Sequence, residues 1–101
     1  GSIVDLVTTL KEETTPARIN DAVRAAAFSD RLKHILYYSE APIVSSDIIR
    51  SPYSTTFDSL ATMVMGENVS KTLAWYDNGW GYAHRVVDLI NTFKRLEKEA
   101  A

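Results

Sequence analysis

The residues best suited to chemistry lie together at positions 75–82, which read Trp-Tyr-Asp-Asn-Gly-Trp-Gly-Tyr. Asp77 and Asn78 have the side chains that cap helices and form turns. Four aromatic side chains offer apolar area with polar ends, and two glycines let the backbone bend or approach a ligand closely. An alternating apolar run precedes this octapeptide and a helical pattern follows it. A strand-to-helix corner of this kind presents free N–H donors, which suits a ligand.

The octapeptide has a second interpretation as a capped junction whose aromatic side chains fill a core, because aromatic stripes are usually buried. Other chemistry is limited by composition. The 101-residue chain has no cysteine, which excludes disulfides, thiolate catalysis and zinc–thiolate sites within it. Its two histidines, His34 and His84, lie far apart without ligand-like spacing. We therefore predict no metal site.

Composition and charge indicate an ordinary soluble globular domain. Apolar residues make up 46% and charged residues 24% of the chain. The net charge of −2 gives no basic surface for nucleic acid and no polybasic signal for a membrane. No apolar run approaches the length of a membrane span, and no signal peptide is visible. We expect a cytoplasmic protein with neither a nucleic-acid nor a membrane partner.

The elements that must position the octapeptide follow from periodicity and capping. β-Branched residues with period-two alternation predict a strand at residues 3–10. Thr15 followed by Pro16 predicts a helix start, and apolar residues at helical spacing extend that helix to residue 27, with its apolar face on a sheet. The other predicted elements are strands at residues 34–38, 55–58, 61–65 and 69–76, and a final helix from about Gly81.

The connections between these elements predict the fold class. Gly66 and its neighbours between the last two strands indicate a hairpin. Residues 46–54 resemble a long surface loop, a length typical of functional or interface loops. The order β-α-β-β-β-β-α predicts an α+β fold, in which two helices pack on one face of a mostly antiparallel sheet. We expect residues 1–101 to form a single domain.

The octapeptide resembles a stretch of the C-terminal part of glyceraldehyde-3-phosphate dehydrogenases. The family stretch reads Trp-Tyr-Asp-Asn-Glu-Trp-Gly-Tyr and continues into a run like Arg-Val-Val-Asp-Leu. This chain continues with the same five residues at positions 85–89. The resemblance extends backwards, in order and without large gaps, through residues 4–6, 13–15, 19–20, 25–27, 42–48 and 54–58.

This resemblance implies that the chain is the C-terminal portion of a dehydrogenase catalytic domain. The family oxidises an aldehyde phosphate to an acyl phosphate in glycolysis, using NAD and inorganic phosphate. Its Rossmann NAD-binding domain and its catalytic cysteine and histidine have no counterpart in this chain. We therefore expect no catalytic residue here and no activity from the chain alone. Asn78 and Tyr82 match the positions that contact the nicotinamide carboxamide and ring, so we predict them as cofactor-binding residues, without tight binding of NAD by this chain alone.

Some positions depart from the family pattern. Gly79 stands in place of the usual glutamate, and Arg50 stands where glycine is frequent. Such changes suggest a divergent member, or one relieved of catalytic constraint. The second hypothesis is accordingly a non-catalytic interaction module, which forms a homo-oligomer or binds the remainder of the dehydrogenase because exposed strand edges and apolar faces promote pairing. The resemblance leaves open glyceraldehyde 3-phosphate against erythrose 4-phosphate, and NAD against NADP.

Overall fold

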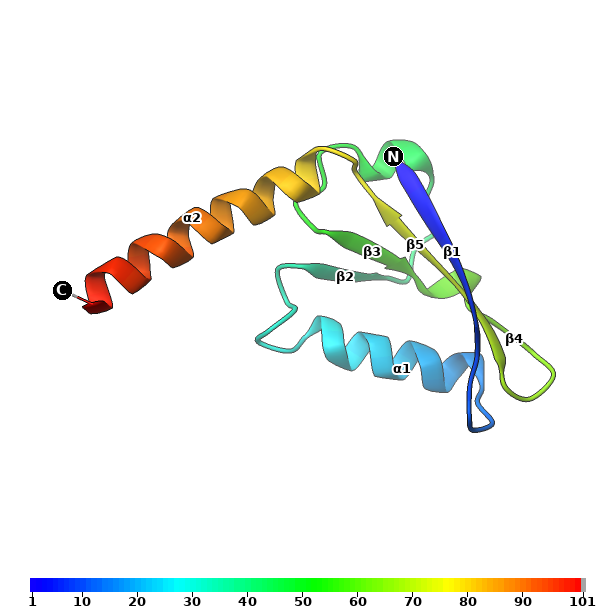
Figure 1. Cartoon of the computed structure of the whole chain (residues 1–101). Coiled ribbons are helices and arrows are strands. Elements are labelled where there is room, and N and C mark those ends of the chain that lie inside the picture. The colour runs from blue at the N-terminus through cyan, green and yellow to red at the C-terminus, as the bar shows by residue number, and fades with distance from the viewer. Residues whose placement is uncertain (101) are drawn as a thin grey trace.

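The sheet is organised around one central strand, β5 (Val69–Tyr76), in the computed structural model, which describes residues 1–100 (Figure 1). On one edge, β1 (Ser2–Thr9) pairs antiparallel with the whole length of β5. On the other edge, β4 (Met63–Met65) pairs with the start of β5 and β3 (Thr55–Asp58) with its end, both antiparallel. β2 (Leu36–Ser39) adds to β3 in parallel. The mostly antiparallel sheet of the predicted α+β fold is confirmed.

The first helix, α1 (Pro16–Ala27), begins where local chemistry predicts. The hydroxyl of Thr15 accepts a hydrogen bond from the backbone N–H of Arg18, and proline occupies the first helical position. α1 packs against β2, and the two elements lie side by side in Figure 1. Ala27 at the end of the helix is buried. The prediction that this helix covers the sheet is confirmed.

One polar side chain ties α1 to the segment that follows β3. The amide nitrogen of Asn20 donates to the carbonyl oxygen of Ser59 at 3.0 Å. The amide oxygen of Asn20 accepts from the hydroxyl of Thr62 at 2.7 Å. Ser59 opens a short 3₁₀ helix, η2 (Ser59–Ala61), which occupies the start of the strand predicted at residues 61–65. Asn20 therefore fixes the helix to the sheet through both ends of one amide.

The covered core is small. Among residues 1–100, the buried apolar side chains are those of Ala27, Ile48 and Phe57. The ring of Phe57 stacks on that of Tyr38, with centroids 6.0 Å apart. The apolar side chains of β1 are exposed on both of its faces. The described part thus leaves much apolar surface uncovered.

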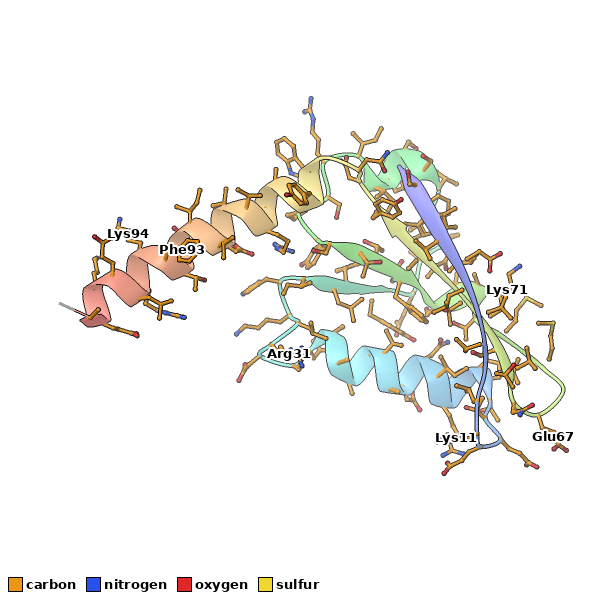
Figure 2. All side chains as sticks on the ribbon, viewed as in Figure 1. Lys11, Arg31, Glu67, Lys71, Phe93 and Lys94 are labelled. Atoms are coloured by element: carbon orange, nitrogen blue, oxygen red, sulfur yellow. The ribbon has the colours of Figure 1, made fainter. Side chains whose placement is uncertain are left out.

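The second helix, α2 (Trp80–Ala100), projects away from the sheet (Figure 1). No other helix or strand of residues 1–100 packs along it, and Figure 2 shows Phe93 and Lys94 far from the sheet. The predicted packing of both helices on one face of the sheet therefore holds for α1, whereas α2 extends away from the sheet. Neither helix is both long and apolar enough to cross a membrane. Apolar side chains at helical spacing along one face of α2 are exposed, and we call them the α2 stripe: Val86, Leu89, Ile90, Phe93 and Leu96.

Several predicted boundaries shift by a few residues. The strand predicted at residues 34–38 begins at Leu36, because the preceding residues form turns that end with the N–H of Leu36 donating to the carbonyl of Leu32 at 2.9 Å. The predicted loop begins with a 3₁₀ helix, η1 (Ser45–Ile48). The hairpin between β4 and β5 is confirmed, and Gly66 within it has a φ of +63°, the left-handed region that favours glycine.

Candidate functional site

The corner between β5 and α2 is held by the carboxylate of Asp77. Its Oδ1 accepts hydrogen bonds from the backbone N–H groups of Gly79 at 2.9 Å and Trp80 at 2.8 Å, which caps the start of α2. Its Oδ2 accepts from the backbone N–H of Arg50 at 3.0 Å. These hydrogen bonds favour the ionised carboxylate, with that from Trp80 contributing most, and they lower the pKa of Asp77.

The side chain of Asn78 is oriented from the neighbouring strand. The hydroxyl of Ser2 donates a hydrogen bond of 2.6 Å to its Oδ1. Ser2 lies opposite Tyr76 in the β1–β5 ladder, so strand register brings the start of β1 to the corner. The amide nitrogen of Asn78 donates no hydrogen bond within residues 1–100. That nitrogen is therefore available to a ligand.

Asn78 and Tyr82 line the same shallow depression, with a volume of about 320 Å³. Tyr82 lies in the first turn of α2 and is 75% exposed, so its ring faces solvent. The structure thus brings the two predicted cofactor-contacting residues together. The other residues lining the depression are Ser54, Tyr76, Asp77 and Arg85.

Arg85 forms one side of this depression and is held in place by two partners. Its Nη1 donates to the hydroxyl of Ser54 at 3.0 Å, and its Nε donates to the carboxylate of Asp88 at 2.9 Å. The depression therefore offers an amide donor, an aromatic ring and a fixed cation. Those groups suit the binding of a planar polar ring. The one carboxylate in the lining, that of Asp77, is already held by three backbone N–H groups.

The start of α2 is pressed against the segment that precedes β3. Gly81 is buried, and a Cβ atom placed on it would lie 2.8 Å from the carbonyl oxygen of Tyr53. Only glycine allows such a close approach to a backbone oxygen. This contact and the Asp77 cap together fix the direction in which α2 leaves the sheet.

The aromatic residues of the octapeptide divide into two groups. The indole Nε1 of the half-buried Trp75 donates to Oδ2 of Asp58 at 3.3 Å, so Trp75 contacts the neighbouring strand β3. Asp58 is buried, and its Oδ1 has no hydrogen-bond partner within residues 1–100. Trp80 does not fill a core, as the second interpretation of the octapeptide would require. It is 45% exposed, and its ring centroid lies 5.7 Å from that of His84.

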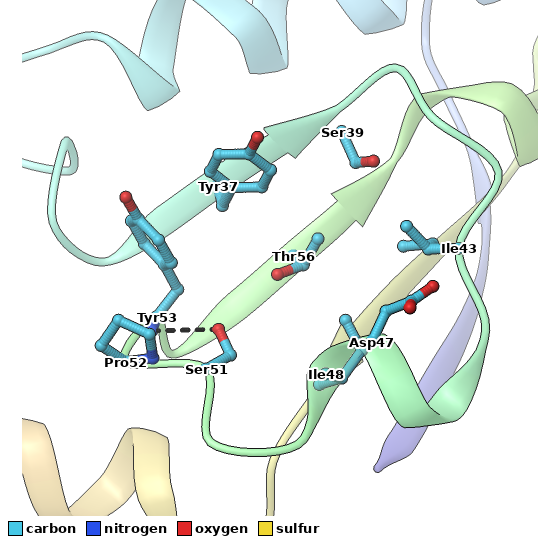
Figure 3. A pocket seen from close by; sticks show the side chains of 9 residues that line it. All are labelled: Tyr37, Ser39, Ile43, Asp47, Ile48, Ser51, Pro52, Tyr53 and Thr56. Atoms are coloured by element: carbon cyan, nitrogen blue, oxygen red, sulfur yellow. Dashed lines mark hydrogen bonds between the residues drawn. The ribbon is translucent and has the colours of Figure 1, made fainter.

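A second hollow of about 280 Å³ lies between the sheet and the crossover from β2 to β3 (Figure 3). Tyr37 and Thr56 line its sheet side, and Ile48 of η1 faces them. The one carboxylate in its lining, Asp47, accepts from the backbone N–H of Val44 at 2.9 Å. This carboxylate stabilises the start of η1, and nothing in the lining points to catalysis.

No metal site is formed within residues 1–100, where no three His, Asp or Glu side chains gather in a suitable cluster. His34 is exposed in the turn before β2, and His84 lies beside Trp80 on α2. The two histidines therefore lie in different parts of the fold.

Sequence reasoning missed Ser2 and Ser54 as parts of the corner. No periodicity reveals which residue will lie opposite Tyr76 once the strands pair, so the role of Ser2 had no local signal. Arg50 did carry a sequence signal, because the resemblance places it where glycine is frequent. In the structure its φ is +64°, the one positive value at a non-glycine residue within residues 1–100.

Comparison with known proteins agrees with this geometry. The family model described as glyceraldehyde 3-phosphate dehydrogenase, C-terminal domain, matches residues 1–78. A glyceraldehyde-3-phosphate dehydrogenase of Mycobacterium avium is 51% identical over 90 residues, covering 89% of this chain and 26% of the relative. That of Streptomyces coelicolor is 52% identical over 89 residues, covering 88% and 26%.

Glyceraldehyde-3-phosphate dehydrogenase 2 of Staphylococcus epidermidis is 43% identical over 100 residues, covering 99% of this chain and 28% of the relative. The chain thus spans about a quarter of the length of the curated relatives it matches. The family match covers more than half of the chain and includes the sheet, α1 and the corner as far as Asn78. This chain belongs to the glyceraldehyde 3-phosphate dehydrogenase C-terminal domain family.

Proposed function

We propose that this chain forms the nicotinamide-side wall of the active site of an NAD-dependent phosphorylating aldehyde dehydrogenase. The whole enzyme would oxidise an aldehyde phosphate to an acyl phosphate, with inorganic phosphate as the acceptor. The observation that carries the proposal is that Asn78 and Tyr82 line one depression at the β5–α2 corner. Membership of the family supports it.

The two residues have complementary roles in this proposal. The amide nitrogen of Asn78 donates to the carbonyl oxygen of the nicotinamide carboxamide, which fixes the rotation of the ring. The ring of Tyr82 lies against the nicotinamide face and sets the face from which hydride is transferred. Gly79, in place of the family's glutamate, leaves this side of the depression without an added charge.

The remaining parts of the active site lie outside this chain in the same proposal. The chain has no cysteine to attack the aldehyde, and its own single domain carries no dinucleotide-binding fold. A thiol nucleophile and a phosphate-binding helix start are what acyl transfer and tight NAD binding require. We therefore propose that the chain alone is inactive and binds NAD weakly. The place of the whole enzyme in cytoplasmic glycolysis follows from the proposed reaction.

The activity part of the proposal is tested by a direct assay. Purified chain is mixed with glyceraldehyde 3-phosphate, NAD and inorganic phosphate, and NADH formation is followed by absorbance. The expected result is no turnover under conditions in which the complete enzyme of Geobacillus stearothermophilus, a relative 51% identical over 88 residues, is active. Turnover by this chain, retained after repurification, would contradict the proposal.

The binding part is tested by NMR titration of the chain with millimolar nicotinamide mononucleotide. The expected shifts are confined to backbone amides around Asn78, Tyr82 and Arg85. Asn78→Ala weakens binding at least threefold, because it removes the amide donor. Asn91→Ala, an exposed position farther along α2, is the matched control and leaves binding unchanged. Equal binding by both variants would remove Asn78 from the site.

The exposed apolar surface favours a second candidate function, that of a non-catalytic interaction module. The α2 stripe and both faces of β1 are uncovered, and exposed patches of this kind mark contact surfaces. The partner would be a second copy, giving a homo-oligomer, or the remainder of the dehydrogenase.

Light scattering over a concentration series tests self-association. The wild-type chain is expected to exceed the monomer mass, and Phe93→Lys within the α2 stripe is expected to return it to the monomer. Asn91→Lys adds the same charge to α2 outside the stripe and serves as the control. A wild-type chain that stays monomeric at high concentration would contradict the homo-oligomer.

A further inference from the structure

We propose that Ser2 is a positioning residue for Asn78, and that it sets the selectivity of the corner for a ligand carbonyl oxygen. The hydroxyl of Ser2 holds the amide oxygen of Asn78, so that the amide nitrogen is presented to the depression. The ligand class follows from this orientation: a planar ring bearing an oxygen acceptor, such as a carboxamide. The identification of that ring as nicotinamide rests on the proposed function, whereas the orientation of the amide does not.

The orientation is the one that the hydrogen bond in the structure gives, with the amide oxygen of Asn78 facing the Ser2 hydroxyl. The Ser2 hydroxyl and Oδ1 of Asn78 are 2.6 Å apart, with the hydroxyl as donor. A primary amide has one acceptor end and one donor end, so fixing the oxygen also fixes the direction of the NH2 group. That NH2 group belongs to a residue that lines the depression and makes no other hydrogen bond within residues 1–100.

Both partners of this hydrogen bond are anchored by their backbones. Ser2 lies opposite Tyr76 in the β1–β5 ladder. The carbonyl of its neighbour Gly1 accepts a hydrogen bond from the hydroxyl of Ser45 at 3.2 Å. Asn78 follows Asp77, whose carboxylate is fixed by three backbone N–H groups. The contact between the two side chains therefore joins two rigid segments, as a positioning interaction requires.

Removing the hydroxyl frees the amide to rotate. In a Ser2→Ala variant, the oxygen and nitrogen of Asn78 can each turn toward the depression, and the preference for an oxygen acceptor falls. Ser2→Thr keeps a hydroxyl at the same place in the strand and should restore the preference. The exposed Ser46, whose hydroxyl donates no hydrogen bond within residues 1–100, provides a control serine.

The first experiment needs no ligand. The side-chain NH2 resonances of Asn78 are compared by NMR in the wild-type chain and in the Ser2→Ala, Ser2→Thr and Ser46→Ala variants. The expected result is that Ser2→Ala moves and broadens these resonances, while the other two variants leave them close to the wild type. Unchanged Asn78 resonances in Ser2→Ala would overturn the positioning role.

The second experiment measures selectivity by titration with nicotinamide mononucleotide and its thioamide analogue, in which sulfur, a weak acceptor, replaces the carbonyl oxygen. The wild-type chain is expected to prefer the oxygen compound about threefold to tenfold, the range that one neutral hydrogen bond gives. Ser2→Ala should lose this preference and Ser2→Thr should keep it. An equal preference in the wild type and Ser2→Ala would overturn the proposal while leaving the nicotinamide site intact. A third outcome is that Ser2→Ala changes the Asn78 resonances but the wild-type chain binds neither compound. That outcome would retain the positioning role of Ser2 and refute the nicotinamide contact.

Discussion

The carboxylate of Asp77 accepts a hydrogen bond from the backbone N–H of Arg50 at 3.0 Å, although the two residues are 27 positions apart. The same carboxylate caps α2 through Gly79 and Trp80. One side chain thus joins the loop before β3 to the corner that carries Asn78. The geometry of the corner depends on the charge of Asp77 and on the backbone at Arg50, and both dependences are testable.

Asp77→Asn is expected to lower stability at neutral pH and to have less effect in acid. Three backbone hydrogen bonds, that from Trp80 first, lower the pKa of the folded carboxyl. Its stabilising contribution is therefore fully present above the ordinary Asp pKa of about 3.9 and is lost as pH falls through the lowered folded value. Urea unfolding of the wild type and variant across pH measures the difference in unfolding free energy, which should shrink in acid.

Asp21→Asn is the control for this pH series, because Asp21 is exposed on α1 and its change removes the same charge. The control should unfold at nearly the wild-type urea concentration at neutral pH. A stability loss in Asp77→Asn that stayed constant from neutral to acid pH would show that the charge of Asp77 plays no part in the cap.

Arg50→Gly is expected to stabilise the chain. Arg50 has a φ of +64°, in the left-handed region that costs a non-glycine residue about 1–2 kcal/mol. Part of the gain is offset by the greater freedom of glycine in the unfolded chain, about 0.5–1 kcal/mol. A net increase of about 1 kcal/mol in the free energy of unfolding should appear in urea melts. Arg50→Ala removes the same side chain but keeps the strained backbone, so an equal gain in both variants would contradict this explanation.

Local chemistry made much of the fold predictable. Thr15 and Pro16 determine the start of α1 from adjacent residues, and Gly66 supplies the positive φ that the β4–β5 turn needs. The octapeptide likewise contains its own cap, since Asp77 bonds to residues two and three positions further on. Such features depend on sequence neighbours, so their patterns are visible before any folding is considered.

Features that join distant segments were not predictable in this way. Ser2 and Asn78 are 76 positions apart, and only the β1–β5 register brings them together. The stripe on α2 correctly indicated a face that is apolar, but an apolar face does not specify what covers it. The stripe was therefore expected on the sheet, whereas the close contact at Gly81 and the Asp77 cap direct the helix away.

Asn20→Ala is expected to destabilise the chain by about 1–3 kcal/mol, the range for leaving buried polar partners unpaired. The change removes the hydrogen bonds to the carbonyl of Ser59 and from the hydroxyl of Thr62, both partners being buried. Chemical denaturation measures the loss. Asp21→Ala is the control: it introduces alanine at the next position of α1, which is exposed, and should cost less than about 0.5 kcal/mol. Similar costs at both positions would mean that the Asn20 amide does not tie α1 to η2.

The two glycines of the octapeptide should respond oppositely to alanine. A Cβ at Gly81 would lie 2.8 Å from the backbone oxygen of Tyr53, which cannot move aside as a flexible side chain does. Gly81→Ala should therefore cost about 1–3 kcal/mol, as other overpacked sites do. At Gly79 the nearest atom is Oδ1 of Asp77 at 3.9 Å and φ is not positive, so alanine should be neutral or stabilise by up to about 1 kcal/mol.

Urea unfolding measures both glycine variants, and NMR shows whether the corner moves with them. Because Gly81 holds the start of α2 against Tyr53, its replacement should also shift the resonances of Tyr82 and Asn78 on either side of it. Gly79→Ala, two residues away, controls for the general effect of alanine near the helix start. Equal stability of the two variants would mean that α2 is not pressed against Tyr53, and the direction in which α2 leaves the sheet would then rest on the Asp77 cap alone.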